Sequence, residues 1–483
     1  MAVRRGLWLT DAELAALPSS GTKYNVVKSW ADATIPAGAR LNIHDSDYDH
    51  GPYILARALI YAKTGTASYR TSVIDELTTY IGTETNPQGP GYSGQEPWLA
   101  MGRKLPSLVA AADLVGYSDA TFDIWLGGLR DAIFPGWGTK SLHTEQRGRN
   151  NNHSTASGQG LIFIDAYLND TTRLADHAQV LKSYIDLATT YSLTFPWTTT
   201  TWHYTTTGSL KRGINPLGAT KLGHSIDGVL PEEQRRPGGG TIETWPPPGT
   251  ANYPRGAMGQ IVNSLMVLWH RYDATCWDWG DSALERAVEW WSTAFDGKSA
   301  FGWDGDDGSI PFLTNWAYSR SETGVIAPGE GAGGRSMNKS IDFTDYTHPG
   351  TLGAPVHILA LTGTITPAGA LRRAVARAFS GRITPSGALT LFGGAPPVQL
   401  LELAGLIAPA GALARLTGKK LAGTVTASGA VARLVTKTMS GTLTPAGALA
   451  RVLTQSAQTL AAAVTLNLGG FKDHHWRRRA RRR

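Results

Sequence analysis

The chain has 483 residues, 42% of them hydrophobic and 17% charged, so it is long enough for a large core plus an appended domain. This composition excludes a mainly disordered protein. The formal net charge of +7 is concentrated in residues 471–483 (FKDHHWRRRARRR), because the rest of the chain is nearly neutral. Such a basic segment could contact nucleic acid, a membrane surface or an acidic glycan. We favour a solvated terminus and expect no nucleic-acid partner.

Cysteine content and hydropathy argue against a disulfide-stabilised protein and against a protein with a membrane-spanning helix. Cys276 is the single cysteine, so no intrachain disulfide can form. No run of about 20 apolar residues is present, and we therefore expect no membrane span. The N-terminal stretch has no apolar run long enough for a signal peptide.

Apolar residues recur at helical spacing through the first 320 or so residues, which predicts a mainly α protein. Gly, Pro, Asn and Asp separate these segments, as in repeated helical hairpins of an α/α architecture. Two long interruptions, at roughly 194–255 and 317–352, have the length of functional loops. The predicted helices cover residues 53–63, 71–81, 107–115, 121–134, 156–168, 172–191, 257–271 and 282–295.

The chain changes character after about residue 350, where a short motif repeats. GTITPAGAL begins at Gly363, and related units begin at Gly381, Gly405, Gly423 and Gly441. Each unit has the pattern of a strand, a turn and a second strand, although an Ala/Leu/Arg helix is an alternative. The repeats contain almost no His, Glu or Asp, so we interpret residues 351–470 as a smaller β-rich structural or attachment region. Residues 1–350 form the predicted helical domain, and 471–483 the basic tail.

The sequence HTEQRGRNNNHSTASG, at 143–158, concentrates polar side chains just before a helical run. Its NNH motif (Asn151, Asn152 and His153) favours a loop or a helix cap. Arg147, Arg149 and Asn152 could bind a carboxylate, and His153 could share a proton. On spacing alone we favour the simpler alternative, in which these residues only cap the helix.

Further motifs accompany this one. YILARALIYAKTGTASYR and LPSLVAAADLVGY carry a TG-x-x-x-Y turn and an A-x-D-L pattern, and DGVLPEEQRR at 227–236 has the spacing D-G-x-x-P-x-E-x-x-R. Together with NNH, and with Tyr253 ahead of a helix, they resemble the alginate lyase family over roughly residues 6–320. The resemblance implies an (α/α) toroid or incomplete barrel. The chain departs from the family where Ser154 follows NNH, in place of an aromatic pair, and where 237–252 lengthen the approach to Tyr253.

The family reaction is β-elimination on a uronic acid polymer. Removal of the C5 proton builds negative charge on the neighbouring carboxylate, which polar donors must stabilise. The resemblance assigns Asn152, His153 and Arg236 to this role. It assigns Tyr253 as the acid and, in one alternative, also as the base, with His153 as the other candidate base. Neither a metal nor a cofactor is required. The expected substrate-binding residues are His143, Arg147, Arg149, Arg235 and Trp245, with Arg235 also the alternative to Arg236.

Two other functions fit parts of the sequence. An α/α-barrel glycoside hydrolase needs two opposed carboxylates, for which the candidates are Asp227, Glu232, Glu233, Asp304, Asp306 and Asp307. A non-catalytic glycan-binding virion or surface protein is the second alternative. The GWDGDDGS run at 302–309 resembles a calcium loop, but we favour a solvated turn.

We expect an acidic polysaccharide as partner, and attachment to a virion or self-association through the repeats. A lyase acting on an extracellular glycan must reach it, so we expect an extracellular or virion-associated protein. Leakage, lysis or delivery on a phage particle would each explain the missing signal peptide.

Overall fold

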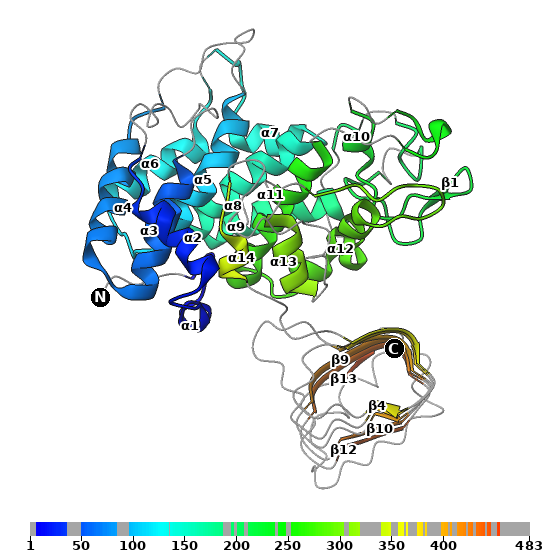
Figure 1. Ribbon diagram of the computed structural model, residues 1–483. Helices are drawn as coiled ribbons and strands as arrows, with labels where there is room; N and C mark the ends of the chain where they lie inside the picture. Colours follow the sequence, from blue (N-terminus) through cyan, green and yellow to red (C-terminus); the bar gives the residue numbers. More distant parts are fainter. Residues whose placement is uncertain are drawn as a thin grey trace, which may run out of the picture. The chain divides into compact units, whose positions relative to one another are not determined.

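The structure is a computed structural model in which the chain divides into two units, residues 1–351 and 352–483 (Figure 1). In the first unit it describes residues 6–35, 50–84, 96–134, 136–186, 195–197, 200–206, 211–236, 240–247, 253–303, 309–318 and 340–348. In the second it describes the strands between 356 and 454.

The first unit is mainly helical, as its apolar periodicity predicts. All eight predicted helices are present, with ends shifted by a few residues or, at 107–115, by a longer N-terminal extension. The helices are α1 (Asp11–Ala16), α2 (Thr22–Asp32), α3 (Gly51–Thr64), α4 (Ala67–Tyr80), α5 (Pro97–Leu114), α6 (Ala120–Asp131), α7 (Leu142–Gly148), α8 (Asn152–Leu168), α9 (Thr171–Ile185), α10 (Pro231–Gln234), α11 (Tyr253–Arg271), α12 (Trp279–Ser292), α13 (Ser309–Tyr318) and α14 (Thr344–Thr347).

Helix α8 is the centre of the core, because it is buried along nearly its whole length. It packs against α5, α7, α9 and α11, and Figure 1 shows it in the middle of the helical unit. The approach to α5 is close enough to require a glycine. A Cβ at Gly102 would lie 2.4 Å from the carbonyl oxygen of Ala156. The start of α8, which carries the NNH motif, is therefore rigidly placed.

The helix contacts run in a closed series. Helix α2 packs on α3, α3 on α5, α5 on α8, α8 on α11, α11 on α13, α13 on α14, and α14 again on α2. Side chains from the N-terminal segment and from the region of α14 make the contacts that close the series. Lys23 Nζ donates to the Asp345 carbonyl at 3.0 Å, and the Tyr346 hydroxyl donates to the Pro18 carbonyl at 2.9 Å. The Trp8 ring meets the His348 ring edge-on at 5.5 Å between centroids.

The two long interruptions contain short elements of their own. The first holds the two-stranded antiparallel sheet of β1 (Thr220–Lys221) and β2 (His224–Ser225), helix α10 and a 3-10 turn, Ile242–Thr244. The second ends in α14. Residues 304–308, with most of the calcium-like run, lie outside the described residues.

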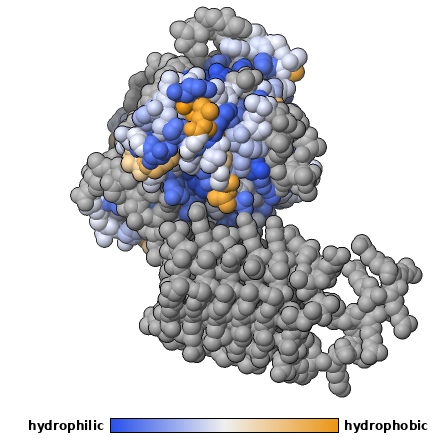
Figure 2. All heavy atoms as spheres, turned by 90° about the vertical axis from the view of Figure 1, so that its right-hand side faces the viewer, coloured by the Kyte–Doolittle hydropathy of each residue, from blue (hydrophilic) through white to orange (hydrophobic). Residues whose placement is uncertain are grey.

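Figure 2 shows the face near β1 and α10, where hydrophilic residues surround a few separate hydrophobic patches. Isolated apolar side chains of this kind are normal on a folded domain and define no docking surface. Within the described part of the chain, no helix has both the length and the apolar content that crossing a membrane requires.

The second unit contains two parallel sheets. Register follows the repeat, because Val356 pairs with Ala374, and Thr424 with Thr442, which are equivalent positions in successive units. One sheet has the order β13-β11-β9-β7-β5-β3 and the other β12-β10-β8-β6-β4. The strands are β3 (Val356–Leu361), β4 (Thr364–Ile365), β5 (Ala374–Phe379), β6 (Arg382–Ile383), β7 (Val398–Leu403), β8 (Leu406–Ile407), β9 (Leu413–Leu421), β10 (Thr424–Ala427), β11 (Val431–Met439), β12 (Thr442–Pro445) and β13 (Val452–Thr454).

We expect a chain ending at Gly350 to fold by itself, because the helical contacts close among residues that precede this point. Its helical circular dichroism per helical residue should match that of the full chain, and it should keep any activity on short soluble substrate. Light scattering on both chains measures assembly. Loss of the helical spectrum would show that the repeats belong to the helical fold, and equal protomer numbers would exclude the repeats as the oligomerisation element.

Candidate functional site

The site is built on the first turn of α8. Asn151 caps the helix with its side chain, which accepts a hydrogen bond from the His153 backbone N–H at 3.1 Å. The backbone N–H of Asn152, free of helical partners at this end, donates to the Glu233 carboxylate. Capping and site formation are therefore combined, with Asn151 acting as the cap and the next two residues contributing side chains to the site.

The segment 227–236 reaches this turn because it is docked on α12. Arg286 forms an ion pair with Asp227. Gly228 has φ +77°, and a Cβ there would lie 2.2 Å from the Arg286 carbonyl oxygen, so the close approach requires glycine. The chain then enters α10, where Glu233 is buried beside the start of α8.

Arg236 is the hub of the site. Its Nη1 donates to Asn152 Oδ1 at 2.6 Å and lies 3.3 Å from Glu233 Oε2. Its guanidinium carbon lies 3.6 Å from the centroid of the Tyr253 ring, within the range of a cation–π contact. Tyr253 begins α11, so one arginine joins α8, α10 and α11.

His153 is held as a neutral ring. Its Nδ1 lies 3.0 Å from the Trp98 indole Nε1, and an indole N–H can only donate. Nδ1 is therefore the acceptor, and the proton of the neutral ring is on Nε2. Burial, together with the positive charges of Arg149 and Arg236, lowers the pKa of His153 to about 3. At neutral pH the ring offers an N–H donor at Nε2.

Glu233 is a member of the site that sequence reasoning placed only among the carboxylates of the rival hydrolase. It is 1% exposed and touches both Asn152 and Arg236. Burial raises its pKa to about 7, against the opposing effect of Arg236. The spacing P-x-E-x-x-R contains this residue, and its position three residues before Arg236 was the available indication of a pair.

The raised pKa of Glu233 predicts a pH-dependent stability. Between its unfolded value of 4.5 and about 7, the folded protein binds the proton that the unfolded chain releases. This contribution is complete below pH 4.5 and is lost as the pH rises to about 7, at a cost on the order of 3 kcal/mol. Urea unfolding of wild type and Glu233→Gln measures this contribution. Between about pH 5 and pH 8 the free energy of unfolding of the wild type should fall by this amount relative to that of the variant. A difference in free energy of unfolding between the two proteins that is the same at both pH values would contradict the assignment.

Three of the expected substrate-binding residues have partners of their own. Arg149 Nε pairs with Glu145 at 2.7 Å, and its guanidinium lies 5.9 Å from the centroid of the Trp98 ring, which places it close to His153. Arg235 pairs with Glu232. Trp245 stacks on His224 at 4.3 Å between centroids, with an interplanar angle of 10°. Arg149 thus borders the site, whereas the contacts of Trp245 are with residues outside it.

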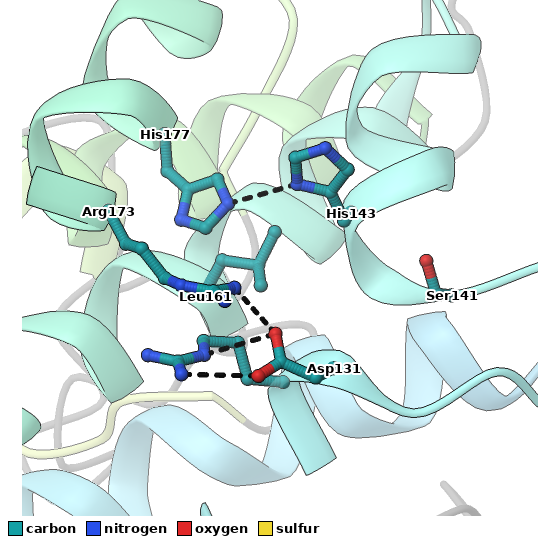
Figure 3. A pocket seen from close by; sticks show the side chains of 7 residues that line it. Asp131, Ser141, His143, Leu161, Arg173 and His177 are labelled. Carbon is teal, nitrogen blue, oxygen red and sulfur yellow. Dashed lines mark hydrogen bonds and ion pairs between the residues drawn. The ribbon is translucent and has the colours of Figure 1, made fainter. Parts of the chain in front are cut away.

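The other two expected binding residues, His143 and Arg147, lie on α7 and face α9. His143 lies beside His177, as Figure 3 shows, and Arg147 pairs with Asp176. They form a second cluster, separate in its contacts from the Arg236 hub.

Searches of protein-family models and of curated proteins found no match to this chain. The four residues expected to be catalytic lie at one place, contributed by two helices, α8 and α11, and by the turn that follows α10.

Proposed function

We propose that this protein is a polysaccharide lyase that cleaves a uronic-acid-containing, alginate-like glycan by β-elimination. The observation that carries the proposal is the position of Arg236, which contacts Asn152 and lies over the ring of Tyr253. A cation, an amide and a phenol at one place provide the groups that carboxylate stabilisation and proton transfer require.

In this mechanism the substrate carboxylate is bound by three donors. Arg236 supplies positive charge, Asn152 supplies its side-chain N–H groups, and His153 supplies the N–H at Nε2. Neutral His153 is suited to this role because it donates without a change of charge. As the C5 proton leaves, negative charge moves onto the carboxylate, and preorganised donors stabilise that charge in the transition state more than in the ground state.

Tyr253 is the proposed proton-transfer group. In its phenolate form Tyr253 takes the C5 proton, and the phenol so formed donates that proton to the glycosidic oxygen as the C4–O bond breaks. His153 is the weaker candidate for the base, because its lone pair at Nδ1 accepts the Trp98 N–H. Glu233 acts as a positioning residue that holds Asn152 and Arg236.

The closed series of helix contacts from α2 to α14 supports the finer fold proposal, an α/α toroid or incomplete barrel. The first turn of α8 and the start of α11 then present their side chains at one end of neighbouring helices. This arrangement would place the site at the rim of the ring.

The contacts of the acidic residues favour elimination over hydrolysis. Asp227, Glu232 and Glu233 pair with Arg286, Arg235 and Arg236, respectively. A carboxylate neutralised by an arginine is less available as a nucleophile. Glu233, whose pKa burial raises, also accepts the Asn152 backbone N–H and so acts within the site as an anchor. The other hydrolase candidates, Asp304, Asp306 and Asp307, lie outside the described residues.

For the repeats we propose a β-rich module that attaches the lyase to a virion or to further copies of itself. Parallel pairing between equivalent positions of successive repeats supports a stack whose terminal strands expose edges. The same proposal makes the protein extracellular or virion-associated.

The proposed function is tested by incubating the purified chain with alginate, hyaluronan, pectate or heparin while absorbance is followed in the near ultraviolet. A lyase creates an unsaturated uronate at the new non-reducing end, which absorbs there. We expect absorbance and new reducing ends to rise together with at least one polymer. New reducing ends without absorbance would identify a hydrolase, and binding without cleavage would identify a glycan-binding protein.

A further inference from the structure

A second cluster lies between α7 and α9, outside the proposed lyase site. His143 Nδ1 lies 3.3 Å from His177 Nε2, and the two rings are inclined by 69°. Asp176 completes a group in which one ligand atom from each residue lies within 4.8 Å of the others. Two nitrogens bound to a tetrahedral Zn²⁺ at about 2.0–2.1 Å are separated by about 3.3 Å. The two imidazoles therefore already have the spacing of a metal-bound pair.

A buried carboxylate orients the inner histidine. His177 is 1% exposed, and its Nδ1 lies 2.5 Å from Asp165 Oδ2. Asp165 is itself fully buried and pairs with Arg130 at 3.1 Å. A carboxylate that accepts the Nδ1 proton leaves the Nε2 lone pair of His177 facing His143. This arrangement of carboxylate and histidine is typical of the outer shell of zinc sites.

The cluster is accessible from solvent. His143 and His177 line a pocket of about 250 Å³, and Figure 3 shows their rings turned toward each other. The pocket is also lined by Arg130, Arg173 and Asp131, and both arginines pair with Asp131. A metal ion would therefore be held here by its ligand atoms and not by the charge of the lining.

We propose that His143 Nδ1, His177 Nε2 and a carboxylate oxygen of Asp176 form a binding site for Zn²⁺ or a similar transition-metal dication. Two imidazoles and one carboxylate are a common zinc ligand set, which leaves a fourth position for water. The ion links α7 to α9. Arg147, which pairs with Asp176, competes with the metal for that carboxylate.

The test is a titration of the chelator-treated full chain with Co²⁺, whose visible absorption reports tetrahedral coordination, followed by displacement with Zn²⁺. We expect one equivalent to bind and to raise the midpoint of thermal unfolding. His143→Ala and Asp176→Asn, both at accessible positions, should each weaken binding by about 10-fold or more, since even outer-shell changes cost 10–100-fold. Arg147→Gln should bind more tightly than wild type.

Two controls separate this site from adventitious binding. His224→Ala removes another accessible histidine that pairs with a carboxylate, Asp296, at 2.6 Å, and it should bind as wild type does. The double variant His474→Ala/His475→Ala removes the adjacent histidines of the basic tail and should also retain the site. Three outcomes would overturn the proposal: metal affinity equal to wild type in the His143 variant, loss of metal binding in the tail variant, or no metal binding by the wild type. These readouts do not involve glycan cleavage, so they are independent of the proposed lyase activity.

Discussion

Tyr253→Phe is expected to reduce turnover about 10²- to 10⁴-fold, because the variant lacks the hydroxyl that transfers the proton. The phenylalanine ring still lies under the Arg236 guanidinium, so the carboxylate-binding groups keep their places. The dissociation constant for the polymer that is cleaved should therefore stay near the wild-type value. Initial rates of absorbance increase and calorimetric binding measure the two quantities.

The matched control for this variant is Tyr69→Phe. The Tyr69 hydroxyl also contacts a polar partner, Asp32, but lies on α4, outside the site. Turnover by this variant should equal that of wild type. A Tyr253→Phe protein that keeps more than about a tenth of the wild-type rate would show that another group transfers the proton.

Arg236→Ala is expected to impair both substrate binding and turnover. Loss of the guanidinium removes the charge opposite the substrate carboxylate, which should raise KM about 10-fold or more. It should also lower kcat about 10²- to 10³-fold, as loss of a transition-state donor does. Because the change leaves the buried Glu233 without its cation, Arg236→Lys is needed beside it. The lysine keeps the charge but cannot reproduce the planar contact with Tyr253 and Asn152.

Arg235→Ala tests whether the correct arginine has been chosen. Arg235 is adjacent in sequence and also pairs with a glutamate three residues earlier, Glu232. Its removal should leave KM and kcat within about twofold of wild type, because its ion-pair partner Glu232 is not one of the four residues expected to be catalytic. If Arg235→Ala is the impaired variant and Arg236→Ala is normal, the roles of the two arginines are exchanged.

The fold of the helical unit was predictable where one helix face is polar. Helix α9 alternates buried and exposed positions at helical spacing, and its predicted and observed ranges largely agree. Helix α5 was underestimated because it is buried on all sides and contains Pro106, so residues before 107 show no periodic polar face. The short α7 was also missed, since seven residues are too few to establish a period.

The residues of the candidate site were also predictable only in part. The motifs identified Asn152, His153 and Arg236, which the fold brings to one place. The spacing within each motif indicates only local geometry, and Asn152 and Arg236 lie 84 positions apart, so it was the family resemblance that linked the two motifs. The role of Glu233 as the anchor of Asn152 and Arg236 depends on burial, which the sequence does not reveal. His177 was missed for another reason. Its partner His143 lies 34 positions earlier, and only the packing of α7 and α9 near α8 brings the two rings together.

The contact of Trp8 with His348, and that of Lys23 with Asp345, has a consequence for the order of folding. These contacts join residues more than 300 positions apart, so the N-terminal segment cannot complete its packing until almost the entire helical unit has left the ribosome. Contacts between α5 and α8, which are much closer in sequence, can form earlier. We therefore expect the helix series to close late in the folding of this unit. Until then, α2 lacks its contact with α14 and Trp8 lacks its contact with His348, a state that favours capture by chaperones during synthesis.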